Sequence, residues 1–104
     1  MAWIYLLLAS FCEIIFAGCL KLTGNFTNVK WSVLFVFFYI LSVVLLNKAV
    51  QTLPLGTAYA VWTGIGTAGT AILAMFLFNE PVTISRIVFL SMIVLGILGL
   101  KVTH

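Results

Sequence analysis

The chain has 104 residues, of which 64% are apolar and 7% are charged. Soluble domains contain about 25% charged residues, so this composition excludes an ordinary water-soluble globule. A membrane-spanning helix takes about 20 apolar residues, and the length therefore allows at most four spans joined by short turns. The net charge of +3 comes from bases that are spread one per connection or chain end, which does not favour a nucleic-acid partner.

Four apolar runs predict four membrane-spanning helices, because backbone that is exposed to the hydrocarbon core must be helical. The runs cover residues 3–20, 31–50, 56–78 and 84–100. Thr23-Gly24-Asn25 predicts a turn after the first run, and Asn79-Glu80-Pro81 terminates the third. We therefore predict an all-α membrane protein with a single four-helix domain over residues 1–104, embedded in a lipid bilayer.

The first run carries Glu13 ten residues after Trp3. This spacing is about 15 Å along a helix, which places the carboxylate near the bilayer midplane. A charge there costs several kcal/mol unless it is neutralised, solvated or paired, and such residues are functional by default. Every Lys and Arg lies near the end of a predicted helix, so no base is available to pair with Glu13. We predict a site for a proton or an external cation; the alternative is a protonated Glu that only packs and hydrogen-bonds.

The second run carries Ser42 in mid-span, with Tyr39 one turn earlier. A single Ser in a membrane helix usually donates to the carbonyl four residues before it in its own helix. Ser42 is therefore a candidate for the site, with this local hydrogen bond as the alternative.

The third run places Tyr59 and Trp62 three residues apart and hence on one helix face. Aromatic faces attract cations, and a Tyr hydroxyl can hydrogen-bond a carboxylate, so the two side chains are candidates for a wall of the cation site. The alternative for Tyr59 is an aromatic belt at the membrane interface. Small residues also recur in this run. Gly64 and Gly66 predict a kink or hinge, although close helix packing explains them equally well.

The fourth run has no ionisable residue between Arg86 and Lys101. Its small residues are Ser91, Gly96 and Gly99. Small residues let helices approach closely, so we predict that this helix forms a dimer interface.

The loop charges predict no single orientation. Lys21, Lys30 and Arg86 lie on one side of the membrane, while Lys48, Lys101 and the terminal amine lie on the other. This near tie is either a weak signal or the mark of a dual-topology chain that inserts both ways. Alternating access usually needs two inverted halves, and an antiparallel homodimer would supply the second half. The sequence contains no zinc-ligand spacing, phosphate loop or hydrolase motif, so we expect neither an enzyme nor a bound metal or cofactor.

Over essentially its whole length the chain resembles the small multidrug resistance family of bacterial proton-coupled exporters. The resemblance rests on Glu13, Leu20-Lys21, the segment 54–66 (PLGTAYAVWTGIG) and the segment 96–101 (GILGLK). It implies an antiparallel homodimer in the bacterial inner membrane whose two copies of Glu13 bind either protons or a cationic substrate. It also implies that Tyr59 and Trp62 line the site and that Ser42 hydrogen-bonds near Glu13. The same resemblance implies that Gly64 and Gly66 kink the third helix, and that the fourth packs on its partner copy around Gly96.

Ser42, Trp62-Thr63-Gly64 and Gly99-Leu100-Lys101 look like the guanidinium-exporter branch of that family. This branch typically has Trp one turn after the central Glu, where this chain has Phe16. A Phe ring cannot donate a hydrogen bond to orient the carboxylate, so bulkier quaternary ammonium ions become candidate substrates. We expect a proton-coupled antiporter of guanidinium-type cations. The alternatives are a broad multidrug exporter, a subunit of a paired heterodimer and a non-transporting four-helix membrane subunit.

Overall fold

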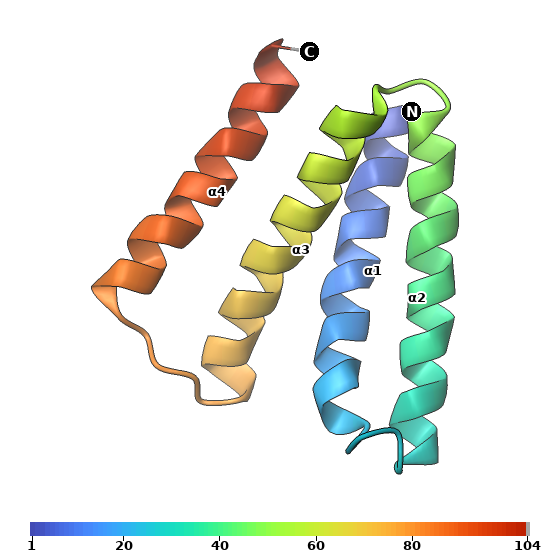
Figure 1. Ribbon diagram of the computed structural model, residues 1–104, viewed down its shortest axis with the longest axis vertical. Coiled ribbons are helices and arrows are strands. Elements are labelled where there is room, and N and C mark those ends of the chain that lie inside the picture. The colour runs from blue at the N-terminus through green and yellow to red at the C-terminus, as the bar shows by residue number, and fades with distance from the viewer. Residues whose placement is uncertain (104) are drawn as a thin grey trace.

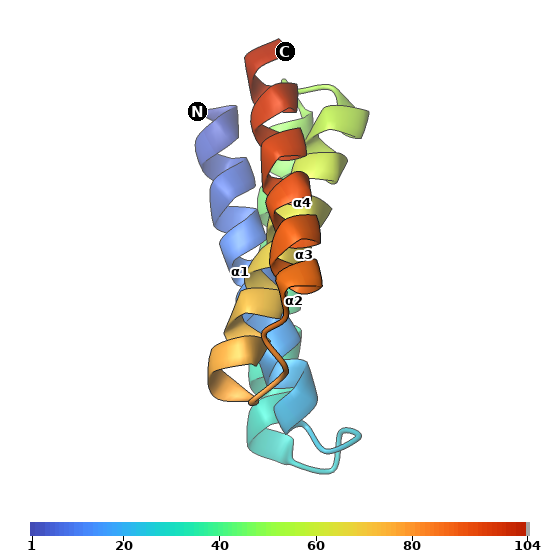
Figure 2. The same cartoon turned by 90° about the vertical axis from the view of Figure 1, so that its left-hand side faces the viewer.

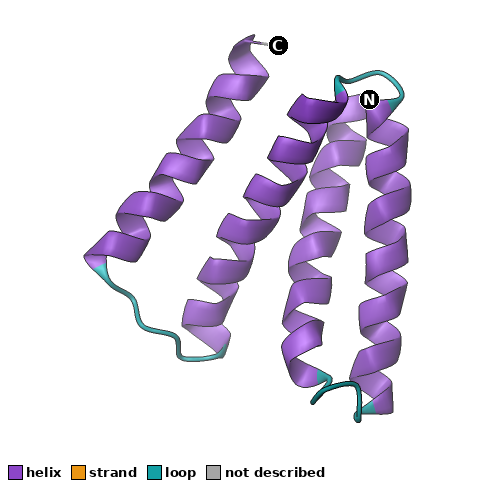
Figure 3. Cartoon of the chain, in the orientation of Figure 1, coloured by secondary structure: helices purple, strands orange, loops and turns teal. Residues whose placement is uncertain are grey.

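The computed structural model describes residues 1–103 as four α-helices joined by short loops (Figure 3). The helices are α1 (Ala2–Leu22), α2 (Val29–Val50), α3 (Leu55–Leu77) and α4 (Ile84–Thr103). All four are long and apolar enough to cross a membrane. The prediction of four spans is confirmed, and every helix end lies within three residues of its predicted position.

The helices alternate in direction and form a thin layer. The α1–α2 and α3–α4 loops lie at one end of the molecule, while the N-terminus, the α2–α3 loop and the end of α4 lie at the other (Figure 1). The Cα trace measures 42 × 35 × 16 Å, and the helices overlap into a narrow profile in the turned view (Figure 2). Because the layer is thin, most helices have a side that no other helix of this chain covers. That side is available to lipid or to another protein.

Helix α1 is the centre of the packing. It runs against α2 and α3, whereas the backbone of α4 approaches α3 alone. A buried apolar cluster joins the start of α1 to the α2–α3 connection, and its members are Leu6, Ala49, Leu53, Ala58 and Val61. No residue of α4 is buried within this chain. The fold is thus a three-helix unit with a fourth helix beside it.

Glycines in α3 allow its neighbours to come close. A Cβ on Gly64 would lie 2.8 Å from the Cδ1 atom of Ile97, so the missing side chain of Gly64 admits α4. A Cβ on Gly69 would collide with Ile14 of α1. Close packing therefore accounts for these two small residues. Helix α3 runs without a break through Gly64 and Gly66, and a kink there stays a prediction.

The α1–α2 loop contains the predicted turn. Gly24 and Asn25 have φ angles of 56° and 61°, in the left-handed region that these residue types tolerate best. Asn28 then begins α2, because its side-chain oxygen accepts the backbone N–H of Trp31 at 3.4 Å. The sequence did not predict that Phe26 shares the left-handed conformation, with a φ of 65°.

Candidate functional site

Glu13 lies in the middle of α1 and faces α3. Its carboxylate occupies the space that a side chain on Gly66 would fill, since a Cβ built there would collide with both oxygens of Glu13. Gly66 is itself buried. Glycine at this position therefore gives the acidic side chain a place against the backbone of α3.

The Glu13 side chain lines a cavity between α1 and α3. The cavity has a volume of about 430 Å³ and is lined by Glu13, Phe16, Ala17, Gly66, Thr67, Thr70, Ala71, Ala74 and Glu80. This size falls within the range of small-molecule binding sites. Both acidic residues of the chain line this one cavity, Glu13 in mid-helix and Glu80 in the α3–α4 loop. The cavity is consequently suited to a positively charged occupant.

Within residues 1–103, no basic side chain forms an ion pair with Glu13. The ion pair in this part of the chain joins Arg86 to Glu80. Each lysine ammonium group lies over an aromatic ring. The distance from the lysine Nζ atom to the ring centroid is 5.0 Å for Lys21 and Phe78, 5.4 Å for Lys30 and Trp31, 5.5 Å for Lys48 and Tyr5, and 5.6 Å for Lys101 and Trp3. For the described residues this agrees with the expectation that Glu13 has no basic partner. Among the described residues, Glu13 therefore has no ionic partner.

Phe16 lies beside Glu13 in the cavity wall. Its ring makes edge contacts with Phe35 at 5.6 Å and with Tyr39 at 5.3 Å between ring centroids. The structure therefore brings Phe16 and Tyr39 together, although Tyr39 is not among the residues that line the cavity. The Phe16 ring is apolar and offers no hydrogen-bond donor, whereas Thr67 and Thr70 on the α3 side of the cavity carry hydroxyl groups.

Ser42 joins all three packed helices. Its fully buried hydroxyl donates to the carbonyl oxygen of Ala9 on α1 at 2.7 Å and accepts the indole N–H of Trp62 on α3 at 2.9 Å. The alternative in which Ser42 bonds only within its own helix is therefore wrong, because α1 offers a carbonyl at this crossing. Ala9 precedes Glu13 by one helical turn, so the hydrogen bond from Ser42 fixes the backbone of α1 close to the acid.

Tyr59 and Trp62 lie side by side, as their spacing predicts. Their ring centroids are 5.5 Å apart, and Tyr59 is 53% exposed. Neither residue lines the cavity that holds Glu13. The cavity extends from Gly66 toward the C-terminal end of α3, whereas Trp62 lies one turn nearer its N-terminus. One chain therefore does not gather the predicted aromatic wall and the acid around a single space.

Three polar residues that line the cavity are absent from the predicted site. Thr67 and Thr70 belong to α3, and the sequence indicates Glu80 only as part of the polar segment that ends the third helix. The spacing of Trp62, Gly66 and Thr70 by four residues places them on one helix face, and this signal could have identified Thr70. Glu80 reaches the cavity because its backbone N–H bonds to the Ala74 carbonyl at 3.2 Å, which folds the segment back onto α3.

The predicted dimer residues lie on α4. The Ser91 hydroxyl donates to the carbonyl of Ile87 in its own helix at 2.7 Å. Side chains built on Gly96 and Gly99 would meet no atom within 4 Å, so this part of α4 is open to close approach by another helix. The interface itself stays a prediction.

Replacing Ser42 by Ala should loosen the junction of the three helices. The Trp62 indole would lose its acceptor, and we expect the free energy of unfolding to fall by about 1 kcal/mol, in the range measured for hydrogen bonds between membrane helices. Ser10→Ala is the matched control, because the equally buried Ser10 hydroxyl bonds only to Leu6 of its own helix at 2.8 Å. Unfolding in mixed micelles and the indole N–H resonance of Trp62 would measure both effects. Equal destabilisation by the two variants, with an unmoved Trp62 resonance, would contradict the interhelical role.

Comparison with known proteins identifies the family of the chain. A family model described as "Small Multidrug Resistance protein" matches residues 1–93. Curated proteins named "Guanidinium exporter" are 46% identical over 105 residues in Citrobacter freundii, covering all of both chains, and 46% identical over 101 residues in Proteus vulgaris, covering 97% of each. A further protein of that name in Salmonella typhimurium is 43% identical over 103 residues, covering 99% of this chain and 98% of its own. The chain therefore belongs to the small multidrug resistance family, and it is a multi-pass protein of the bacterial inner membrane.

Proposed function

We propose that the chain exports small guanidinium-type cations in exchange for protons and works as an antiparallel homodimer. The observation that carries this proposal is Glu13, an acid in the middle of a membrane-spanning helix that lines a cavity of about 430 Å³. No base of the described chain pairs with it. The names of the relatives support guanidinium as the cation.

The exchange follows from the two Glu13 carboxylates of the proposed dimer, one from each copy. Two protons neutralise the pair whereas one cation occupies it, so the exchange moves net charge and produces a current. A protonated Glu13 is neutral and attracts a cation weakly, whereas the ionised form attracts it strongly because the surroundings have a low dielectric constant. Binding of a proton and binding of a cation therefore oppose each other, and by linkage each weakens the other by the same factor. If the cavity opens alternately to the two sides of the membrane, protons that enter on one side displace a cation that entered on the other.

Three features support the antiparallel dimer. The bases divide equally between the two ends of the molecule once the terminal amine is counted, which suits a chain that inserts in both orientations. Helix α4 has no buried residue and presents Gly96 and Gly99 for close packing. A single chain also leaves Tyr59 half exposed and away from the Glu13 cavity, so a second copy would be needed to enclose a cation between both.

Quaternary ammonium ions are a second candidate class of substrate, and the observation that favours them is Phe16. Its ring lines the cavity beside Glu13 and is held there by Phe35 and Tyr39. Quaternary ammonium ions carry no N–H groups and bind by charge and by contact with aromatic faces. An apolar wall next to the acid accepts them more readily than a wall that donates a hydrogen bond.

Proton-coupled currents in proteoliposomes test the proposal. We expect current with guanidinium, and the response to tetraalkylammonium ions of increasing size decides the second candidate. In Phe16→Trp, the indole N–H can orient Glu13, and we expect the preference for guanidinium over tetraethylammonium to rise about tenfold, the value of one hydrogen bond to a charged group. Current with neither cation in the wild type would contradict transport and leave the non-transporting subunit.

A further inference from the structure

We propose that Glu80 and the carbonyl group of Pro81 form a second cation-binding site at the outer end of the Glu13 cavity, and that the guanidinium of Arg86 occupies this site until a substrate cation displaces it. This inference deepens the proposed function and rests on it for the identity of the cation. It assigns a binding role to a loop that lies outside the membrane-spanning helices.

The position of Glu80 is the first observation. Its side chain lines the same cavity as Glu13 but belongs to the loop between α3 and α4. The hydrogen bond from the Glu80 backbone N–H to Ala74 holds the loop against the end of α3. A cation that approaches Glu13 from this end of the molecule therefore passes the carboxylate of Glu80 first.

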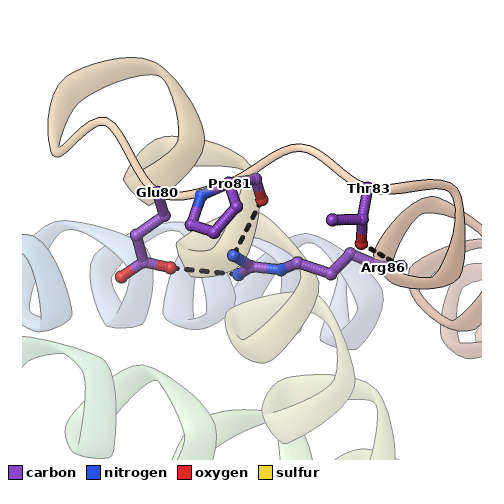
Figure 4. A network of polar contacts seen from close by, with 4 residues as sticks. All are labelled: Glu80, Pro81, Thr83 and Arg86. Carbon is purple, nitrogen blue, oxygen red and sulfur yellow. Dashed lines mark hydrogen bonds and ion pairs between the residues drawn. The ribbon is translucent and has the colours of Figure 1, made fainter.

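The contacts of Arg86 are the second observation. Its Nη2 atom lies 3.0 Å from the Oε1 atom of Glu80, and its Nη1 atom donates to the Pro81 carbonyl at 3.0 Å (Figure 4). The side chain extends from the first turn of α4 back along the loop toward Glu80 (Figure 4). The loop thus already holds a guanidinium group, through one carboxylate oxygen and one backbone carbonyl. Free guanidinium has the same planar set of N–H donors.

The backbone of Arg86 is fixed at the start of α4, whereas its guanidinium group can leave Glu80. The Arg86 backbone N–H donates to the Thr83 hydroxyl at 3.2 Å, which anchors the residue at the start of α4. The paired side chains of Arg86 and Glu80 are 32% and 39% exposed, and ion pairs in contact with water are weak. An arriving guanidinium can therefore replace the tethered one without disturbing the fold.

This replacement has a directional consequence. When Arg86 releases Glu80, its guanidinium adds a free positive charge at the outer end of the cavity. That charge favours movement of the bound cation inward toward Glu13, and Arg86 recovers its partner once the cation has moved on. Glu80 then binds the cation transiently on its way to Glu13, and the Arg86 guanidinium competes with the cation for the Glu80 carboxylate.

Nuclear magnetic resonance provides the direct test, since Arg86 is the single arginine of the chain and its Nε–H resonance is unambiguous. Guanidinium titrated into the protein in nanodiscs should shift this resonance toward that of free arginine. The same shift is expected in Glu13→Gln, because the outer site does not depend on Glu13. Tetramethylammonium has no N–H donors and should leave the resonance in place. An Arg86 resonance that ignores guanidinium would overturn the inference.

Transport kinetics supply a second readout. We expect Glu80→Gln to raise the KM for guanidinium about fivefold and Arg86→Ala to lower it, since the first removes the site and the second removes its competitor. Lys30→Gln is the matched control, because it removes a base from the same end of the molecule but not from the cavity, and its KM should equal that of the wild type. An unchanged KM in Glu80→Gln, or an equal rise in Arg86→Ala, would contradict the assignment.

Failure of the inference and failure of the proposed function give different results. If wild-type vesicles carry no guanidinium while the Arg86 resonance still responds, the transport proposal fails and the outer site stands. If vesicles carry guanidinium while neither the resonance nor the KM of Glu80→Gln changes, transport stands and the outer site is wrong.

Discussion

Vesicles that contain Glu13→Gln are expected to show no guanidinium-driven proton current above that of protein-free vesicles. Glutamine has nearly the same shape as glutamate, so it can occupy the space beside Gly66 and keep α1 against α3. It cannot release a proton or carry the negative charge that attracts a cation. The substitution should therefore abolish binding of both the proton and the cation in the proposed exchange, while the packing of α1 against α3 stays in place.

Glu13→Asp separates the charge from its position. Aspartate keeps the carboxylate but is shorter by one methylene group, and we expect it to retain proton-coupled current with a weaker apparent affinity for guanidinium. Helix content by circular dichroism and elution from a sizing column would show that both variants are folded. Proton-coupled uptake that persists in Glu13→Gln would contradict the mechanism and would favour a purely structural role for Glu13.

The sequence predicted the four helices well and placed Glu13 in the middle of the first, because both depend on local composition. Twenty or so apolar residues in a row can only form a spanning helix, and a single Glu among them has few structural uses. The absence of a basic partner for Glu13 within residues 1–103 followed from the same reasoning, since every base lies near a helix end. Neither conclusion required knowledge of which helices touch.

The partners of individual side chains depended on helix packing and were harder to predict. For Ser42, the local preference is a bond to its own helix, yet the structure supplies the Ala9 carbonyl of α1 and the Trp62 indole of α3. That outcome is set by the crossing of α1 and α2, which periodicity does not reveal. The Ala9 carbonyl lies one helical turn before Glu13, and a role of Ser42 in the site stays a prediction.

The position of Glu80 beside the cavity could not be predicted from the sequence. A loop acid beside a proline indicates the end of a helix, and nothing in its spacing from Glu13 connects the two residues. Their common cavity arises because the loop folds back on α3 and because α3 and α1 separate toward this end of the molecule (Figure 1). Long-range geometry of this kind is created by the assembled helices, so the sequence indicated Glu13 as a candidate but gave no sign that Glu80 lines the same cavity.

Gly66→Ala is the second variant for which we expect a large effect, and it tests whether the site depends on the missing side chain. The added methyl group would collide with the Glu13 carboxylate, which is the end of a flexible side chain and can move aside. The fold should therefore survive while the carboxylate is displaced. Since misplacement of a reacting group by about 1 Å can lower a rate on the order of 100-fold, we expect a loss of that size in kcat/KM for guanidinium exchange.

Two alanine variants of the same helix separate this effect from general changes in α3. A Cβ on Gly56 would meet nothing within 4 Å, so Gly56→Ala should transport at the wild-type rate. Gly69→Ala would press on the Ile14 side chain, a contact between α1 and α3 that does not involve the acid. If crowding of the helices were the cause, Gly66→Ala and Gly69→Ala would lose equal activity and equal stability. A loss of transport confined to Gly66→Ala, with unfolding unchanged, would show that glycine is needed there because it leaves room for Glu13 to bind its cation.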